Sequence, residues 1–177
     1  MSVKRLGRQI MVSAILPAML LFVNSVQSAA AGTEWKKTSG KLTAILVLTD
    51  KPKVYAKAWS KAKSKLPTGL ITTAVKKSKL LVAMVFFKGC AGDSTNLCDS
   101  EITYHVFKPD GKLYAKRVGL SLWKHAVVKS GLMLSSANLA LSFEAKDPVG
   151  KYKVIVNISD NIAKKKLKLT RFVTVSK

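Results

Sequence analysis

Few residues in this sequence could carry out acid–base chemistry. The only histidines are His105 and His125, and the nine acidic residues are scattered, most of the aspartates in turn-like segments. General acid–base catalysis requires such groups to converge on a substrate. No serine lies in a G-x-S-x-G elbow, and there is no glycine-rich phosphate loop. The sequence therefore favours a non-catalytic protein. The alternative is a small secreted hydrolase with either histidine in a loop-borne cleft beside a serine or carboxylate.

Cys90 and Cys98 are the only cysteines and enclose a short loop of turn-forming residues. Two cysteines of an exported protein are expected to form a disulfide. A redox-active pair is usually spaced C-x-x-C, which this pair is not. Asp93, Asn96 and Asp99 carry oxygens that could bind calcium, but they lack the spacing of a calcium loop and fit turn chemistry equally well. We predict a structural disulfide, no metal and no cofactor.

The first 31 residues have the composition of an export signal. Three basic residues precede an apolar run over 10–23, and a stretch of small residues ends at Ala31. These features are typical of a signal peptide, and the apolar run is short for a transmembrane helix. We predict a signal peptide over 1–31, one domain over 32–177, no transmembrane span after processing, and a periplasmic or secreted location.

The rest of the chain is strongly basic. Because three of the 31 basic residues and none of the nine acidic ones fall in the first 31 positions, residues 32–177 carry a formal charge of +19. Such a field attracts anions. The expected partners are an anionic envelope component (lipid phosphate or acidic polysaccharide) or an acidic protein. Nucleic acid is less favoured, because only Arg117 and Arg171 of the 28 basic residues in 32–177 are arginines, and arginine dominates base and phosphate recognition. The alternative that the many lysines serve only solubility stays open.

Two groups of lysines are the candidate anion-binding residues. One recurs every four residues along a predicted helix and the other is the densest basic cluster: Lys53, Lys57, Lys61 and Lys65; Lys164, Lys165, Lys166 and Lys168. The first group could meet an anionic surface, or could lie in water while the opposite helix face packs on the domain. The second is expected at a hairpin tip, where it could contact an anion or block unwanted strand pairing.

The predicted helix covers residues 52–66. Asp50 suits the N-cap and Pro52 the first turn, while Pro67 and Gly69 end the helix. The apolar residues at helical spacing are expected on one face: Val54, Tyr55, Ala58, Trp59, Ala62 and Leu66.

Most of the remaining sequence alternates with the period of β-strands. Residues 42–49 and 80–87 are apolar on both faces, as expected for strands covered on both sides. Further short strands follow, separated by turn signals. Seven or eight such strands predict a mainly β, antiparallel sandwich with one inserted amphipathic helix.

The C-terminal half carries a recognisable corner. Asp147-Pro148-x-Gly150-x-Tyr152-x-Val154, then Asp160 and Phe172-x-x-Val175, resemble the last two strands of immunoglobulin-like domains. The macroglobulin-type sandwiches of bacterial envelope proteins are similar. The resemblance covers about residues 80–177 and implies that the Tyr152 hydroxyl bonds back to the backbone. It implies an architecture and no activity. The leading hypothesis is an exported, non-catalytic, immunoglobulin-like interaction module.

Overall fold

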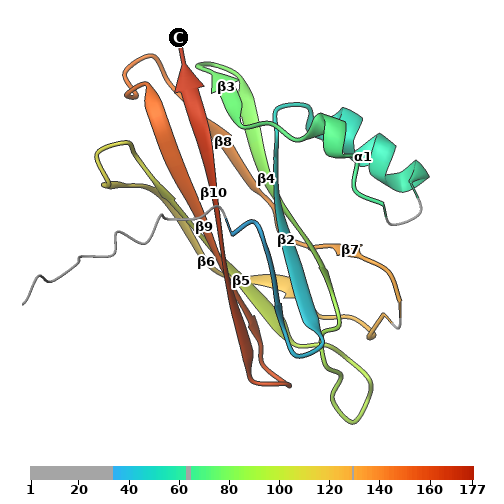
Figure 1. Ribbon diagram of the computed structural model, residues 1–177. Coiled ribbons are helices and arrows are strands. Elements are labelled where there is room, and N and C mark those ends of the chain that lie inside the picture. The colour runs from blue at the N-terminus through green and yellow to red at the C-terminus, as the bar shows by residue number, and fades with distance from the viewer. Residues whose placement is uncertain (1–33, 63–64, 129) are drawn as a thin grey trace, which may run out of the picture. The chain divides into compact units, whose positions relative to one another are not determined.

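The computed structural model describes residues 34–62, 65–128 and 130–177, all within one compact unit, Ala31–Lys177. The predicted signal peptide lies outside the described residues. Those residues form ten strands, one α-helix and one short 3-10 helix, Thr68–Leu70 (Figure 1). Among them, no helix is both long enough and apolar enough to cross a membrane.

The strands form two sheets. Sheet A has the order β1-β2-β4, and both β7 and β8 pair with the other edge of β4. Its strands are β1 (Lys36–Ser39), β2 (Leu42–Thr49), β4 (Leu80–Lys88), β7 (Met133–Leu134) and β8 (Leu139–Ser142). Sheet B has the order β3-β10-β9-β5-β6. Its strands are β3 (Ala74–Lys76), β5 (Ser100–Phe107), β6 (Leu113–Trp123), β9 (Gly150–Asp160) and β10 (Lys165–Ser176).

The predicted mainly β, immunoglobulin-like sandwich with one helix is therefore confirmed. The strand count exceeds seven or eight because β1, β3 and β7 have only four, three and two residues. Alternation over so few positions is no sequence signal. The short β3 also runs parallel to β10, whereas the other paired strands are antiparallel.

The main core lies between the sheets. Alternate side chains along each strand point inward, as the period of two requires. Its largest fully buried members come from both sheets: Phe87, Tyr104, Phe143, Tyr152, Leu46 and Ile102.

A second apolar cluster covers the outer face of sheet A. There α1 (Pro52–Lys61) lies over β2 and β4 (Figure 1). Tyr55 is fully buried, and the ring centres of Trp59 and Phe86 are 4.5 Å apart. Because β4 packs on the main core with one face and on this cluster with the other, both of its faces are buried. The predicted packing of Tyr55 and Trp59 on the sandwich is confirmed.

The helix differs from its prediction in three respects. It ends at Lys61 rather than at 66, the N-cap is Lys51 rather than Asp50, and Val54 is 54% exposed. No side chain caps the first turn, and that turn contains no acid to complement the helix dipole. Lysines four residues apart add repulsion. Contact with sheet A therefore holds the helix.

The predicted tyrosine corner is present. The Tyr152 hydroxyl donates to the Pro148 carbonyl at 2.9 Å. Beside it, Asp147 Oδ2 accepts the Glu144 N–H and the Tyr114 hydroxyl, each at 2.8 Å. Burial alone would raise the pKa of Asp147, but these hydrogen bonds hold it below its usual value.

We expect Asp147→Ala to lower the free energy of unfolding at neutral pH by about 1–3 kcal/mol, because it removes the buried carboxylate that accepts the Glu144 N–H and the Tyr114 hydroxyl. Asp147→Asn keeps an acceptor and should lose less. Since the pKa of Asp147 is lower in the folded protein, its stabilisation is complete above pH about 4 and disappears as the pH falls through the folded value. Urea unfolding at pH 7 and at pH 3 measures both effects. If the difference in free energy of unfolding between wild type and Asp147→Asn were the same at pH 3 as at pH 7, this account would be contradicted.

Candidate functional site

The outer face of sheet B is open to solvent. Even-numbered residues of β10 and odd-numbered residues of β9 project from it, with Lys166 opposite Ser159 and Thr174 opposite Lys151. Most residues between them point into the core, whereas Arg171 reaches past the edge of β10 toward β2 of sheet A. Among the described residues, the α-helix covers the outer face of sheet A and leaves the outer face of sheet B uncovered (Figure 1). The outward-pointing side chains of β9 and β10 are therefore accessible to a partner.

Three lysines line a groove of about 460 Å³ near the β9–β10 turn. Lys166 and Lys168 come from β10 and Lys37 from β1, and Asn157 and Ser159 line the same groove. Lys37 Nζ is 2.9 Å from a carboxylate oxygen of Glu34, and both side chains are exposed. No acidic residue lines the groove itself. It therefore offers positive charge together with amide and hydroxyl groups.

A second depression, of about 350 Å³, lies farther along β10. Its lining combines aromatic, cationic and hydroxyl side chains: Trp35, Thr73, Lys151, Arg171, Phe172 and Thr174. The guanidinium carbon of Arg171 is 5.4 Å from the centre of the Trp35 ring, and Lys151 Nζ is 4.4 Å from that of Phe172. Both distances are in the range of cation–π contacts. We call the first depression the lysine groove and the second the Trp35 depression.

Arg171 is held in place at the Trp35 depression. Its Nη1 donates to the Leu46 carbonyl at 2.8 Å, across from sheet B to β2. This is its one hydrogen bond to another residue among those described, although a guanidinium has five N–H donors. Burial lowers the pKa of Arg171, but an arginine side chain stays protonated in proteins at neutral pH. The guanidinium is thus a fixed cation with unused donors.

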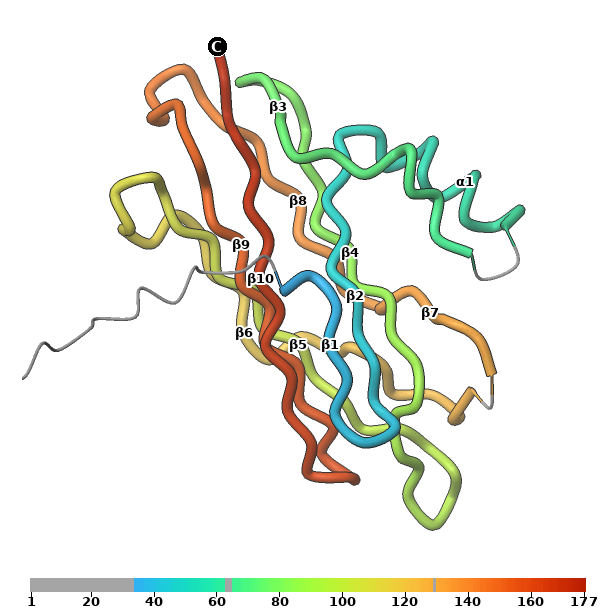
Figure 2. The backbone as a smooth tube through the Cα atoms, in the orientation of Figure 1, coloured from blue at the N-terminus to red at the C-terminus, as the bar shows by residue number. Residues whose placement is uncertain are grey.

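The two depressions follow the same strand. The Glu34 carbonyl accepts the Thr170 N–H at 3.0 Å, and the Thr73 carbonyl accepts the Thr174 N–H at 2.8 Å. Figure 2 shows the start of the described chain, directly before β1, lying beside β10. At about 3.4 Å per residue, β10 extends about 27 Å from Lys166 to Thr174. One extended ligand could therefore contact both depressions.

Neither histidine has the surroundings of a catalytic group. His105 lies on the outer face of sheet B, opposite Lys116 and Ile155, with its ring stacked on Phe107. His125 is exposed, and its ring packs against the Trp123 ring in a T-shaped arrangement. In the described chain neither side chain hydrogen-bonds to a serine or a carboxylate. The geometry thus adds no support for the hydrolase alternative.

The structure separates the two predicted lysine groups. Lys53, Lys57 and Lys61 are exposed on α1, over sheet A, and Lys65 is exposed beyond the end of that helix. In the other group, Lys164 occupies the β9–β10 turn with φ 54°, while Lys165, Lys166 and Lys168 belong to β10. Figure 1 shows α1 and the β9–β10 turn at opposite ends of the sandwich. No single compact ligand can contact both groups.

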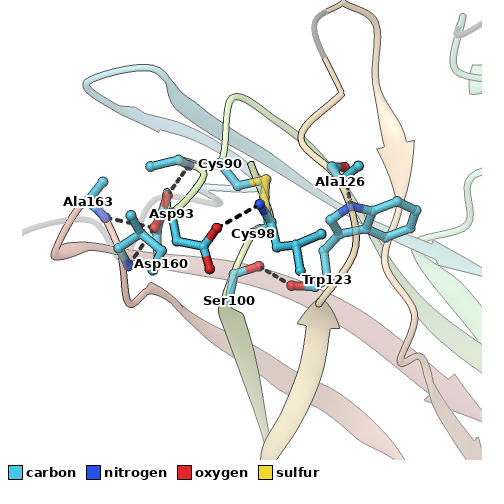
Figure 3. The surroundings of a disulfide bond; sticks show 11 residues. Cys90, Asp93, Cys98, Ser100, Trp123, Ala126, Asp160 and Ala163 are labelled. Carbon is cyan, nitrogen blue, oxygen red and sulfur yellow. Dashed lines mark hydrogen bonds between the residues drawn. A yellow bond between two sulfur atoms is a disulfide. The ribbon is translucent and has the colours of Figure 1, made fainter. Parts of the chain in front are cut away.

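The predicted disulfide joins Cys90 and Cys98, with their Cα atoms 6.1 Å apart (Figure 3). Asp93 closes the enclosed loop, since its Oδ1 accepts the N–H groups of Thr95 and Leu97. These bonds lower the pKa of Asp93. No cluster of three potential metal ligands occurs among the described residues. Asp93 therefore acts here as a turn residue.

A buried aspartate joins the disulfide loop to the β9–β10 turn. Asp160 Oδ2 accepts the Ala91 N–H at 2.8 Å, and its Oδ1 accepts the N–H groups of Ile162 and Ala163 (Figure 3). The turn also meets β1 and β2, because Lys165 and Lys41 line one pocket of about 560 Å³. The disulfide thus helps to position the turn from which β10 and its lysines begin.

No protein-family model and no curated protein matches this sequence. Solved structures similar to it include a Niemann-Pick type C2 protein from Japanese carpenter ant (10% identity, 82% of this chain and 96% of that chain, TM-score 0.43). Another is the CARDB domain of a Pyrococcus furiosus protein (15% identity, 59% and 81% covered, TM-score 0.36). At such scores these likenesses assign neither a family nor an activity.

Several residues that line the two depressions were not among the predicted site residues. They are Trp35, Lys37, Lys151, Arg171 and Phe172. The alternating pattern of β9 and β10, together with the turn between them, was a sequence signal from which the pairing of Lys151 with Thr174 could have been predicted. The position of Trp35 depends on the docking of a distant segment on β10, for which the sequence has no local signal.

Proposed function

We propose that this protein is exported and acts without catalysis, by binding an anionic envelope component or an acidic protein through the outer face of sheet B. The observation that carries the proposal is the run of two cation-lined depressions along β10, on the sheet face that α1 does not cover. The disulfide supports export, because such bonds persist in oxidising compartments. The signal-like N-terminal composition supports it as well.

Binding to vesicles with an anionic lipid, and to a linear acidic polysaccharide, tests the proposal across salt concentrations. Between about 0.05 M and 0.5 M salt we expect affinity to fall by at least about tenfold, because salt screens exposed charges. Zwitterionic vesicles and a neutral polysaccharide are the control ligands. Failure to bind either anionic ligand at low salt would reject the proposal.

A pair of charge-matched variants locates the site. K166E/K168E and K57E/K61E change the net charge equally, but the first pair lies in the lysine groove and the second on α1. We expect K166E/K168E to reduce anion binding by about tenfold or more and K57E/K61E to have little effect. Equal losses would show that the charge acts without a defined site.

A further inference from the structure

We propose that the outer edge of β10 is a binding groove for a linear acidic polysaccharide, with the lysine groove and the Trp35 depression as its two ends. This inference rests on the proposed anion binding and deepens it by naming the ligand class. Its evidence is the lining of the two depressions and the continuity of the strand between them.

The charge on this edge matches an anion that is extended rather than compact. Lys166 and Lys168 project from the same face two residues apart, about 7 Å along the strand. Farther along, Lys151 on the same face and Arg171 at the edge of the strand supply two more cations at the Trp35 depression. Cations are thus repeated along the length of β10, as a chain with an acidic group on many of its units requires.

The neutral groups on this edge suit sugars. Hydroxyl and amide side chains line the two depressions beside the cations: Asn157, Ser159, Thr73 and Thr174. They can both donate and accept hydrogen bonds, as sugar hydroxyls do. Trp35, which is 39% exposed, offers the apolar surface on which the C–H face of a sugar ring can lie. An acidic polysaccharide carries acidic groups, hydroxyl groups and C–H faces, which match the cations, the polar side chains and the aromatic ring of this edge.

Other polyanions fit less well. A bilayer would be met by apolar side chains that protrude beside the cations, but no exposed aliphatic side chain lines either depression. Single-stranded nucleic acid is usually stacked on aromatic rings repeated along the strand. Here the lysine groove has no aromatic residue, and Lys151 Nζ already lies over the Phe172 ring.

The test is titration of the protein, expressed from its full sequence, with oligomers of a linear polyuronate of increasing length. Affinity should rise until the oligomer spans about 27 Å, the extent of the groove along β10, and then level off. We expect Trp35→Ala to weaken binding of the longest oligomer by about tenfold, as for an aromatic at a binding hot spot. It should leave the shortest charged oligomers unaffected. Leu97→Ala, at an exposed apolar residue of the disulfide loop, is the matched control.

Arg171→Lys keeps the charge and removes the planar guanidinium. Because Arg171 also bonds to Leu46, its unfolding curve must be measured beside its affinity. A length-dependent loss in the Trp35 variant together with a folded Arg171→Lys protein of reduced affinity supports the groove.

Three results would overturn the inference. One is affinity independent of length, and another is a Trp35→Ala protein that binds like wild type. The third is oligo-thymidylate or anionic vesicles binding more tightly than the polyuronate at equal salt. If vesicles bind in a manner sensitive to K166E/K168E while the polyuronate does not, the anion-binding function stands and the polysaccharide assignment fails.

Discussion

Replacing Phe86 by alanine is expected to lower the free energy of unfolding by about 3–5 kcal/mol. Phe86 is fully buried on the outer face of sheet A, where its ring meets Tyr55 and Trp59 of α1 at centre distances of 5.8 and 4.5 Å. Its removal leaves a cavity directly beneath the helix. The helix α1 lacks a side-chain cap, and its lysines repel one another. Packing is therefore its main source of stability. We therefore expect the helix to loosen before the sandwich unfolds.

Urea unfolding followed by circular dichroism measures the total loss, and hydrogen exchange of the α1 amides measures the local one. Phe107→Ala is the matched control, because Phe107 is half-buried on the outer face of sheet B and meets no helix. If the two alanine variants were equally stable, the assignment of α1 stability to Phe86 would be wrong.

Removing the disulfide is expected to have the next largest effect. In the chain-entropy account, closing a loop as short as Cys90–Cys98 stabilises the folded state by about 2–3 kcal/mol. For a domain of this size, C90S/C98S should lower the melting temperature by about 5–10 °C. Because the loop holds Asp160 through the Ala91 N–H, the loss should extend to the β9–β10 turn.

The same experiment contains its own control. A reducing agent should lower the melting temperature of the wild-type protein to that of C90S/C98S and leave the variant unchanged. Amide exchange at Ile162 and Ala163, whose N–H groups bond to Asp160, reports on the turn. Unchanged exchange there in C90S/C98S would show that Asp160 holds the turn without help from the disulfide.

Features that depend on neighbouring residues could be predicted from the sequence. The tyrosine corner at Tyr152 and the disulfide each follow from a short pattern, and the structure confirms both. The two-sided burial of residues 42–49 and 81–87 followed from their apolar composition, whereas Leu80 at the start of β4 is 44% exposed. The helix was predicted too long because its apolar period continues to Leu66. That residue does pack on the same cluster, but from beyond the end of the helix.

The candidate site was only partly predictable. Lys166 and Lys168 were selected for their density in the sequence, and both line the lysine groove. The Trp35 depression could not be foreseen, because it forms where residues 35, 73 and 171 meet along β10. Such contacts depend on which segment covers a strand edge. That is decided by the packing of the whole domain.

The sheet margins also bear on self-association. β1, β3 and β7 are very short, and the pairing of β6 with β5 is interrupted by register shifts, with Lys116 and Arg117 exposed on β6. A long, regular margin with free backbone groups is what a second chain needs to continue a sheet. Of the described margins, β6 is long but irregular, and β10 is partly covered, by β3 over Thr174–Ser176 and by the Glu34 carbonyl at Thr170. We therefore expect the domain to resist fibril formation, even when an anionic polymer neutralises its charge.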